Sequence, residues 1–268
     1  MLRRLIGAAS TLGLAALVTG CDGGTTDPSG TTGTFVDDAG ALTCPDTPGS
    51  PAMIAVGGWD GRAYCIDTTE VTNAAYAAWL ETSPEASGQR ADCTGNTSFV
   101  PATGAPPKND LPVVNVDFCD AAAFCVAFGK RLCGRIVGGP TPYYGHDDPA
   151  QSQWHSACTH GGALPFPYGS AYDPNACNGS DAKYGTPLAA FALPGCAGGS
   201  PGLVDMSGNV WEWEDACIPG DAGVPVCRRR GGSFSSSAEY MGCDARSSRP
   251  IDVGEDNTGF RCCADGPG

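Results

Sequence analysis

The cysteine content constrains this chain more than any other feature, because any fold must accommodate fifteen thiols within 268 residues. Reduced cytosolic proteins rarely carry so many cysteines, whereas exported proteins use them as a disulfide framework. A structural zinc site would require closely spaced Cys-x-x-Cys pairs, and the sequence contains none. The cysteines therefore predict an exported, disulfide-rich protein.

The first twenty residues have the pattern of an export signal. Arg3 and Arg4 precede an apolar run from Leu5 to Val18, whose fourteen residues are too few to cross a bilayer core of about 30 Å as a helix. The run ends at Val18-Thr19-Gly20-Cys21, which resembles the lipobox of bacterial lipoproteins. Lipidation of Cys21 would leave fourteen cysteines, an even number. The alternative is an ordinary signal peptide followed by a chance cysteine.

These observations predict three parts of the chain: a lipoprotein signal peptide (1–21), a flexible tether (22–50) and one domain (51–268). The tether is rich in Gly, Thr, Asp and Pro and cannot bury enough apolar area to fold, although Cys44 near its end is expected to be fixed to the domain. We expect the protein to be exported and anchored to the bacterial cell envelope through lipid on Cys21.

The charge balance excludes one class of partner. The net charge is −14, and loss of Arg3 and Arg4 with the leader leaves 13 basic against 29 acidic residues, or −16. A surface of this sign repels polyanions, so we expect no nucleic acid partner. The acidity also suits the binding of divalent cations.

The sequence of the domain predicts helices near its start and irregular β structure toward its end, which is the pattern of an α+β fold. Short strands are expected at 53–56 and 64–66. Thr72 is expected to cap a helix through Leu80, and residues 83–110 to form a loop. Asp117 and Asp120 have the spacing of a capping box for a second helix that stops at Gly129. A third helix is expected over 150–158.

Four segments in order resemble the formylglycine-generating-enzyme (sulfatase-modifying-factor) family. They are Ile66 to Asn73, like the family's D-x-x-E-V-T-N; Pro112 to Phe118 with Gly129 to Leu132; Asp205 to Trp213, reading D-M-S-G-N-V-W-E-W; and Arg230 to Phe234, closed by Gly259 to Cys262. The resemblance implies a C-type-lectin-like variant fold, loop-rich with little regular secondary structure. The chain departs from the family after Leu132, where Cys133-Gly134-Arg135 begins a Gly- and Pro-rich insertion.

The same resemblance implies calcium as a cofactor. The ligands it assigns are the side chains of Asp205 and Glu212 and the backbone carbonyls of Gly208 and Val210. These are hard oxygen donors of the kind that Ca²⁺ prefers. The segment can equally be a turn held by ordinary hydrogen bonds, with Trp211 and Trp213 in the core, and both readings can hold at once. A second family site implies Asn178 and Gly179, with Asp181 as the candidate carboxylate.

Disulfide pairings also follow from the resemblance. It implies bonds between Cys125 and Cys262 and between Cys158 and Cys243. For Cys217 with Cys227 and for Cys177 with Cys196, proximity in the sequence alone suggests local pairs.

The loop after Arg230-Gly231-Gly232-Ser233 decides the function that the resemblance implies. Active members carry two cysteines there whose thiolates bind copper(I) and support oxidation of a substrate cysteine to formylglycine. Counting forward, the two places hold Ser236 and Met241; counting back from Cys243, the second holds Ala238. Neither count finds a cysteine, so no catalytic residue is assigned and copper is not expected.

Three hypotheses remain for the function. The first is a non-oxidase domain that binds a peptide, glycan or protein at the cell surface or serves as a structural module. The second is an active formylglycine-generating oxidase that acts on exported sulfatases, and the third is a different enzyme on the same scaffold. The missing cysteine pair favours the first hypothesis.

Overall fold

The computed structural model describes residues 35–36, 42–58 and 61–266. The expected signal peptide with Cys21, and most of the expected tether, lie outside these residues. A short sheet pairs β1 (Phe35–Val36) with β2 (Leu42–Thr43). No helix within the described ranges has the length and apolarity required to cross a membrane.

The first of two four-stranded sheets joins the start of the domain to its end. It contains β3 (Met53–Gly57), β4 (Ala63–Asp67), β10 (Cys262–Ala264) and β5 (Arg131–Leu132), in that spatial order and all antiparallel. β3 and β4 are the two strands expected near 53–56 and 64–66. β10, the last strand of the chain, therefore lies between β4 of the early hairpin and β5, which comes from the middle of the sequence.

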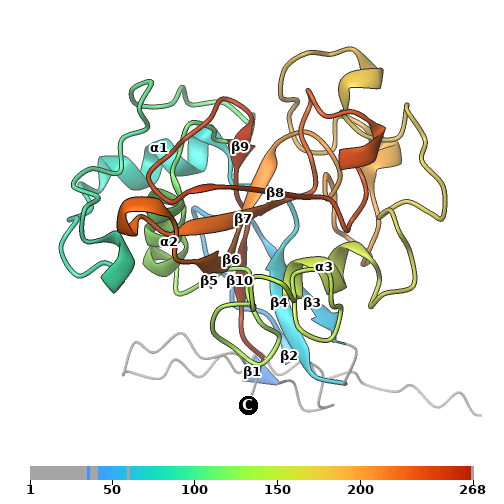
Figure 1. Cartoon of the computed structure of the whole chain (residues 1–268), viewed down its shortest axis with the longest axis horizontal. Helices are drawn as coiled ribbons and strands as arrows, with labels where there is room; N and C mark the ends of the chain where they lie inside the picture. Colours follow the sequence, from blue (N-terminus) through green and yellow to red (C-terminus); the bar gives the residue numbers. More distant parts are fainter. Residues whose placement is uncertain (1–34, 37–41, 59–60, 267–268) are drawn as a thin grey trace, which may run out of the picture. The chain divides into compact units, whose positions relative to one another are not determined.

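The second sheet crosses the centre of the molecule (Figure 1). Its order is β8 (Arg246–Pro250), β7 (Val226–Arg230), β6 (Trp211–Ile218) and β9 (Thr258–Gly259). β8, β7 and β6 are antiparallel, whereas β9 runs parallel to β6. Thus β8 forms one edge of this sheet, and the segment that begins at Asp205 leads directly into β6.

Three helices begin where a side chain caps the first turn. Thr72 Oγ1 accepts from the Ala75 backbone N–H ahead of α1 (Asn73–Glu81). Asp117 and Asp120 form both hydrogen bonds of a capping box at α2 (Phe118–Ala127), as the sequence predicts. α2 ends before Gly129, whose φ of +68° favours glycine.

The third helix is shorter than expected. α3 covers Gln153–Cys158 instead of 150–158, because Ser152 Oγ accepts from the His155 N–H and so occupies the cap position. The expected loop at 83–110 contains a single 3₁₀ turn, Ala91–Cys93. Further 3₁₀ turns lie at Ser180–Ala182, Pro194–Cys196, Asp221–Gly223 and Ala238–Tyr240.

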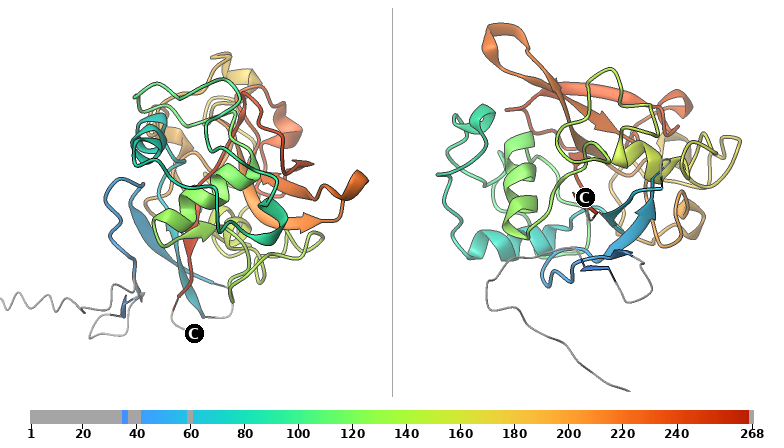
Figure 2. Two further views of the ribbon diagram at one scale, coloured as in Figure 1. Left: turned by 90° about the vertical axis from the view of Figure 1, so that its left-hand side faces the viewer. Right: turned by 90° about the horizontal axis from the view of Figure 1, so that it is seen from below.

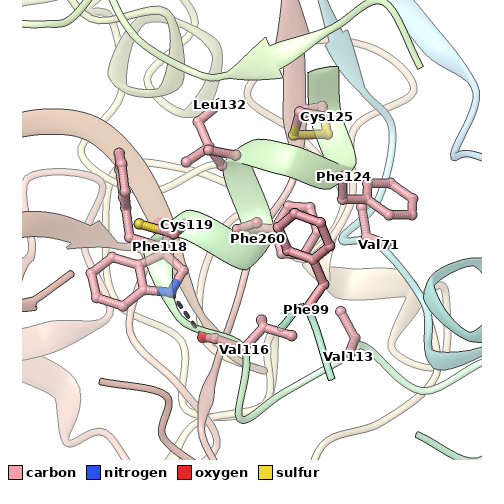
Figure 3. Packing of buried hydrophobic residues seen from close by; sticks show 14 of the residues in the cluster. Val71, Phe99, Val113, Val116, Phe118, Cys119, Phe124, Cys125, Leu132 and Phe260 are labelled. Carbon is pink, nitrogen blue, oxygen red and sulfur yellow. Dashed lines mark hydrogen bonds between the residues drawn. A yellow bond between two sulfur atoms is a disulfide. The ribbon is translucent and has the colours of Figure 1, made fainter. Parts of the chain in front are cut away.

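The larger hydrophobic core lies between α1, α2 and the central strands, and both helices lie on the same side of those strands (Figures 1 and 2). Tyr76 and Trp79 of α1 contact Phe124 of α2, and Phe260 closes the group from the end of the chain. Figure 3 shows Phe124 and Phe260 within this packing. The buried Trp213 indole donates to the Val116 carbonyl at 3.1 Å. Phe118, Phe124 and Cys125 of α2 are buried in this core.

β10 connects this core to a second one. Cys262 belongs to the first cluster and Cys263 to a cluster that includes Tyr64, Trp154 and Met206. Because successive strand residues point to opposite faces of a sheet, the two adjacent cysteines pack into two different cores. Cys262 bonds to Cys125 of α2, and Cys263 bonds to Cys133, just after β5.

Seven disulfides pair all fourteen cysteines from Cys44 onward. Cys158 bonds to Cys243, and the two local pairs Cys177–Cys196 and Cys217–Cys227 are formed. Cys44 bonds to Cys65 in β4, so the end of the expected tether is attached to the domain. Cys93–Cys119 fixes the loop after α1 to α2.

Candidate functional site

The segment that resembles a calcium motif forms a tight turn before β6. Asp205, Gly208 and Asn209 all have positive φ, at +58°, +72° and +60°. Glycine is required at 208, because a Cβ there would lie 2.4 Å from the Asn178 carbonyl oxygen. The turn therefore packs backbone against backbone with the segment that contains Asn178.

Glu212 is held by protein partners. Its Oε2 accepts from Arg261 Nε at 2.7 Å and from Trp154 Nε1 at 2.7 Å, and its Oε1 accepts from Arg261 Nη2 at 2.7 Å. All three side chains are buried. The carboxylate expected to bind calcium therefore neutralises an arginine, whose other hydrogen bonds go to the carbonyls of Asp67 and Val204.

Two more buried carboxylates interact electrostatically with Glu212 and Arg261. Burial raises the pKa of Glu70 well above its usual range, and Asp205 and Glu212 raise it further. Burial raises the pKa of Asp205 to about 6, with Glu212 adding to the increase and Arg261 opposing it. Glu70 was missed as a site residue, although it is the glutamate of the D-x-x-E-V-T-N motif. Three acidic groups thus share one guanidinium.

The two predicted metal segments meet through paired asparagines. Asn178 Nδ2 donates to Asn209 Oδ1 at 3.0 Å, and the Asn209 N–H donates to the Asn178 carbonyl at 2.8 Å. Asn209 Nδ2 donates to Glu70 Oε1 at 3.0 Å. Asn178 Oδ1 is buried with no hydrogen-bond partner. One polar cluster therefore contains residues from both predicted sites.

The remaining predicted ligands differ in their placement. Asp181 accepts from the Tyr172 hydroxyl at 3.0 Å, and this contact is exposed. Gly179 instead packs against Met241, whose Cε would lie 2.7 Å from a Cβ at this position. Among the described residues, no three His, Cys, Asp or Glu side chains are grouped so that they could hold a metal ion.

The loop after β7 contains Ser236 and Met241, the two residues that the family resemblance aligns with catalytic cysteines. Ser236 is buried, and its Oγ accepts from the Ser233 N–H at 2.9 Å, closing a tight turn. Met241 is 1% exposed and packs with Cys177 and Cys196 in a third small core cluster. Its thioether fills space above Gly179 and Gly208. Ser236 therefore closes a turn, and Met241 fills a core.

A hollow opens beside Ser236. It has a volume of about 440 Å³ and is lined by hydroxyl, guanidinium and aromatic side chains, among them Trp211, Arg229, Ser236, Tyr240, Arg246 and Arg249. We call it the Ser236 cleft. It lies against β8 and β7, and Ser235, Ser236 and Ser237 of the loop after β7 form part of its wall.

Similarity to a solved structure defines the class of fold. The chain matches PvdO from Pseudomonas aeruginosa with a TM-score of 0.52 at 17% sequence identity, covering 80% of this chain and 92% of that one. At this identity the likeness concerns the fold alone. The architecture is the α+β, loop-rich C-type-lectin-like variant that the motifs imply.

The family is identified by its sequence model. The sulfatase-modifying factor enzyme 1-like domain matches residues 41–266, which is most of the chain. This chain therefore belongs to the formylglycine-generating-enzyme (sulfatase-modifying-factor) family.

Curated relatives include both inactive and active members. The chain is 31% identical over 180 residues to inactive Cα-formylglycine-generating enzyme 2 of Mus musculus, covering 61% of this chain and 52% of that protein. It is 28% identical over 186 residues to the formylglycine-generating enzyme of Mus musculus, covering 59% and 45%. The chain thus spans about half the length of these relatives.

Proposed function

We propose that this chain is a cell-envelope lipoprotein whose formylglycine-generating-enzyme-like domain binds a ligand and does not oxidise cysteine. One sequence feature supports the proposal: the two places that the resemblance assigns to catalytic cysteines hold Ser236 and either Met241 or Ala238. Every cysteine from Cys44 onward is in a disulfide, so none of them offers a thiolate. Cys243, the cysteine nearest to Ser236 and Met241 in the sequence, is bonded to Cys158.

The residues present do not fit copper(I). This ion prefers soft thiolate or thioether donors, and a serine hydroxyl is a hard one. Met241 has a soft sulfur, but that sulfur is buried against two glycines and the Cys177–Cys196 pair. We therefore assign no oxidation step to the Ser236 cleft. Similarity to an inactive family member supports this assignment.

The ligand we propose is a peptide, glycan or protein at the cell surface. The Ser236 cleft supports a binding role, because it combines concave shape with aromatic walls and polar donors. Its loop is fixed by the Ser233–Ser236 hydrogen bond and by Met241, so the cleft is largely preformed. A preformed cleft binds a ligand with a smaller loss of conformational entropy.

Membrane attachment through Cys21 is part of the proposal. Fourteen of the fifteen cysteines are paired with one another, which leaves Cys21 as the one cysteine outside these seven bonds. This arithmetic supports a lipidated Cys21 at the end of a lipobox. The acidic tether would then hold the domain away from the membrane.

We also propose calcium as a structural cofactor at the polar cluster. Support comes from the unpaired Asn178 Oδ1 and from three buried carboxylates that share Arg261. A divalent cation would offset this excess of negative charge. Because Glu212 is occupied by Arg261, the donors best suited to hold the ion are Asp205, Asn178 Oδ1 and the carbonyls of the Gly208–Val210 turn.

The decisive activity test uses a Cys-x-Pro-x-Arg peptide, the usual substrate motif of active members. The purified full chain is incubated with peptide, copper(I) and oxygen, and the product is analysed by mass spectrometry, with mouse formylglycine-generating enzyme as the positive control. We expect no aldehyde. An aldehyde product that disappears in Ser236→Ala or Cys243→Ala would overturn the proposal.

A further inference from the structure

The Ser236 cleft is positively charged in a protein whose net charge is −14. Arg229 of β7 and Arg246 and Arg249 of β8 line it. Glu255 is the acidic partner of two of these, through ion pairs to Arg229 and Arg249. Two of the three guanidinium groups therefore share one carboxylate, and among the described residues the third, on Arg246, has no acidic partner, which leaves a local excess of positive charge.

Arg229 shows that this charge is incompletely compensated. Its guanidinium donates to Glu255, to Thr258 Oγ1 and to Ser247 Oγ, the last at 2.9 Å. Its Nε is buried without a hydrogen-bond partner, and the whole residue is 2% exposed. An unpaired buried donor of a charged group is costly, so a nearby anion would stabilise this wall.

Arg246 supplies a second arginine side chain to this wall. It is exposed at the start of β8, the edge strand of the second sheet, and its backbone pairs with Arg230. Its side chain makes no hydrogen bond or ion pair with the described part of the chain. The guanidinium therefore remains available for a group that enters the cleft.

The other walls suit the rest of a ligand. Ser235, Ser236 and Ser247 add hydroxyl groups. Trp211 and Tyr240 lie with ring centroids 6.3 Å apart, and Tyr240 is 43% exposed. An aromatic surface beside arginines allows a ring of the ligand to pack while its charged group is held by hydrogen bonds.

From these contacts we infer that the Ser236 cleft is a binding site for a tetrahedral oxyanion, a sulfate or phosphate monoester carried on a ring that packs against Tyr240. Arginines on two strands and several hydroxyls offer more donors than the two oxygens of a carboxylate can use, whereas sulfate and phosphate esters present three. The inference deepens the proposed function and rests on it, because it assigns a ligand class to the same cleft.

The test is isothermal titration of the full chain at low salt with four probes: phenyl phosphate, phenyl sulfate, benzoate and benzyl alcohol. We expect phenyl phosphate or phenyl sulfate to bind more tightly than benzoate, and we expect benzyl alcohol not to bind. Arg246→Gln should weaken ester binding about tenfold, because a charge-assisted hydrogen bond is lost. Raising the salt concentration should weaken it further.

Arg135→Gln is the matched control, since Arg135 is exposed and lies outside the cleft. It makes the same change in net charge and should leave ester binding unaltered. Absence of ester binding, an equal loss in both variants, or stronger binding of benzoate would overturn the inference. None of these three results would overturn the proposed non-oxidase role. That role is tested separately, because only aldehyde formation from the Cys-x-Pro-x-Arg peptide would overturn it.

Discussion

Glu212 and Arg261 illustrate how a motif residue can be recognised and its partner missed. The sequence places Glu212 in a turn that resembles a calcium motif, and the structure puts both of its oxygens on Arg261 and Trp154. Removing Glu212 would leave a buried guanidinium without its hydrogen-bonded carboxylate, which costs about 3–5 kcal/mol whether or not a cation binds. Glu212→Ala is therefore a poor test of calcium binding.

Asp205 gives a cleaner test. A ligand that binds only the folded state stabilises it by about 2.7 kcal/mol at a hundredfold excess over Kd. We expect a chelator to lower the melting temperature of the wild-type chain, measured by scanning calorimetry. Asp205→Asn should abolish that difference, and asparagine tolerates the positive φ at this position.

Asp221→Asn is the control for this experiment, because Asp221 is exposed and lies outside both predicted metal segments. Its melting temperature should respond to the chelator as the wild type does. Identical wild-type melting curves with calcium and with chelator would exclude the cofactor.

Asp120 should make stability depend on pH. Burial and the neighbouring Asp117 raise the pKa of Asp120 to about 7, against an ordinary value near 4 in the unfolded chain. The folded state therefore binds the proton more tightly, and the free energy of unfolding should fall as pH rises from about 4 to about 7.

Asp120→Asn should flatten part of this slope and raise stability at pH 8 by the order of 1 kcal/mol. Asp67 and Asp205 also have raised pKa values, so a residual slope should remain. Urea unfolding at several pH values measures the effect. A variant whose slope equals that of the wild type would show that Asp120 ionises normally in the fold.

Among the elements, those governed by local chemistry are the ones that the sequence predicts well. The caps at Thr72 and Asp117 and the early hairpin follow from short-range patterns. The start of α3 was placed three residues early, because Ser152 had to be recognised as its cap. The Ser236 cleft could not be foreseen, because it combines side chains from β6, β7, β8 and the loop before β9 that meet only in the folded chain.

β10 carries two disulfides in three residues and reaches two hydrophobic cores. Its adjacent cysteines bond across 137 and 130 residues of sequence to Cys125 and Cys133. The two bonds restrict the unfolded chain in nearly the same way, because their cysteines are close together at both ends. When one bond is intact, the other closes a loop of only about ten residues. On the chain-entropy model such a loop contributes about 3 kcal/mol. The last of the two bonds to be removed contributes more, about 4 kcal/mol, because the Cys158–Cys243 bond shortens the loop that it closes to about fifty residues.

We therefore expect the two bonds to be non-additive. Removing either pair by alanine substitution should cost about 3 kcal/mol, and removing both should cost about 1 kcal/mol more than the sum. Denaturant unfolding of the three variants completes the cycle. The local pair Cys217–Cys227 is the control, because its removal should add independently to either long-range pair. Strict additivity for the two long-range bonds would contradict this account.

For the whole molecule, the first question is where it resides. If Cys21 is lipidated, the mature wild-type chain should begin at Cys21, carry lipid and sediment with membranes. Cys21→Ala should yield an unprocessed or mislocalised precursor. Mass spectrometry of the N-terminal peptide and membrane fractionation measure both properties. A wild-type protein that is released from membranes and has a lipid-free N-terminus would refute the anchor.

The central claim for the whole molecule is that the domain has no thiolate pair for copper, and copper affinity tests this without requiring the right substrate. The full chain carrying Cys21→Ser, with disulfides intact, competes anaerobically with a chromophoric chelator for copper(I), and mouse formylglycine-generating enzyme serves as the positive control. The account predicts that this chain withdraws no copper from the chelator. Withdrawal of one equivalent, lost in Ser236→Ala or Met241→Leu, would contradict it.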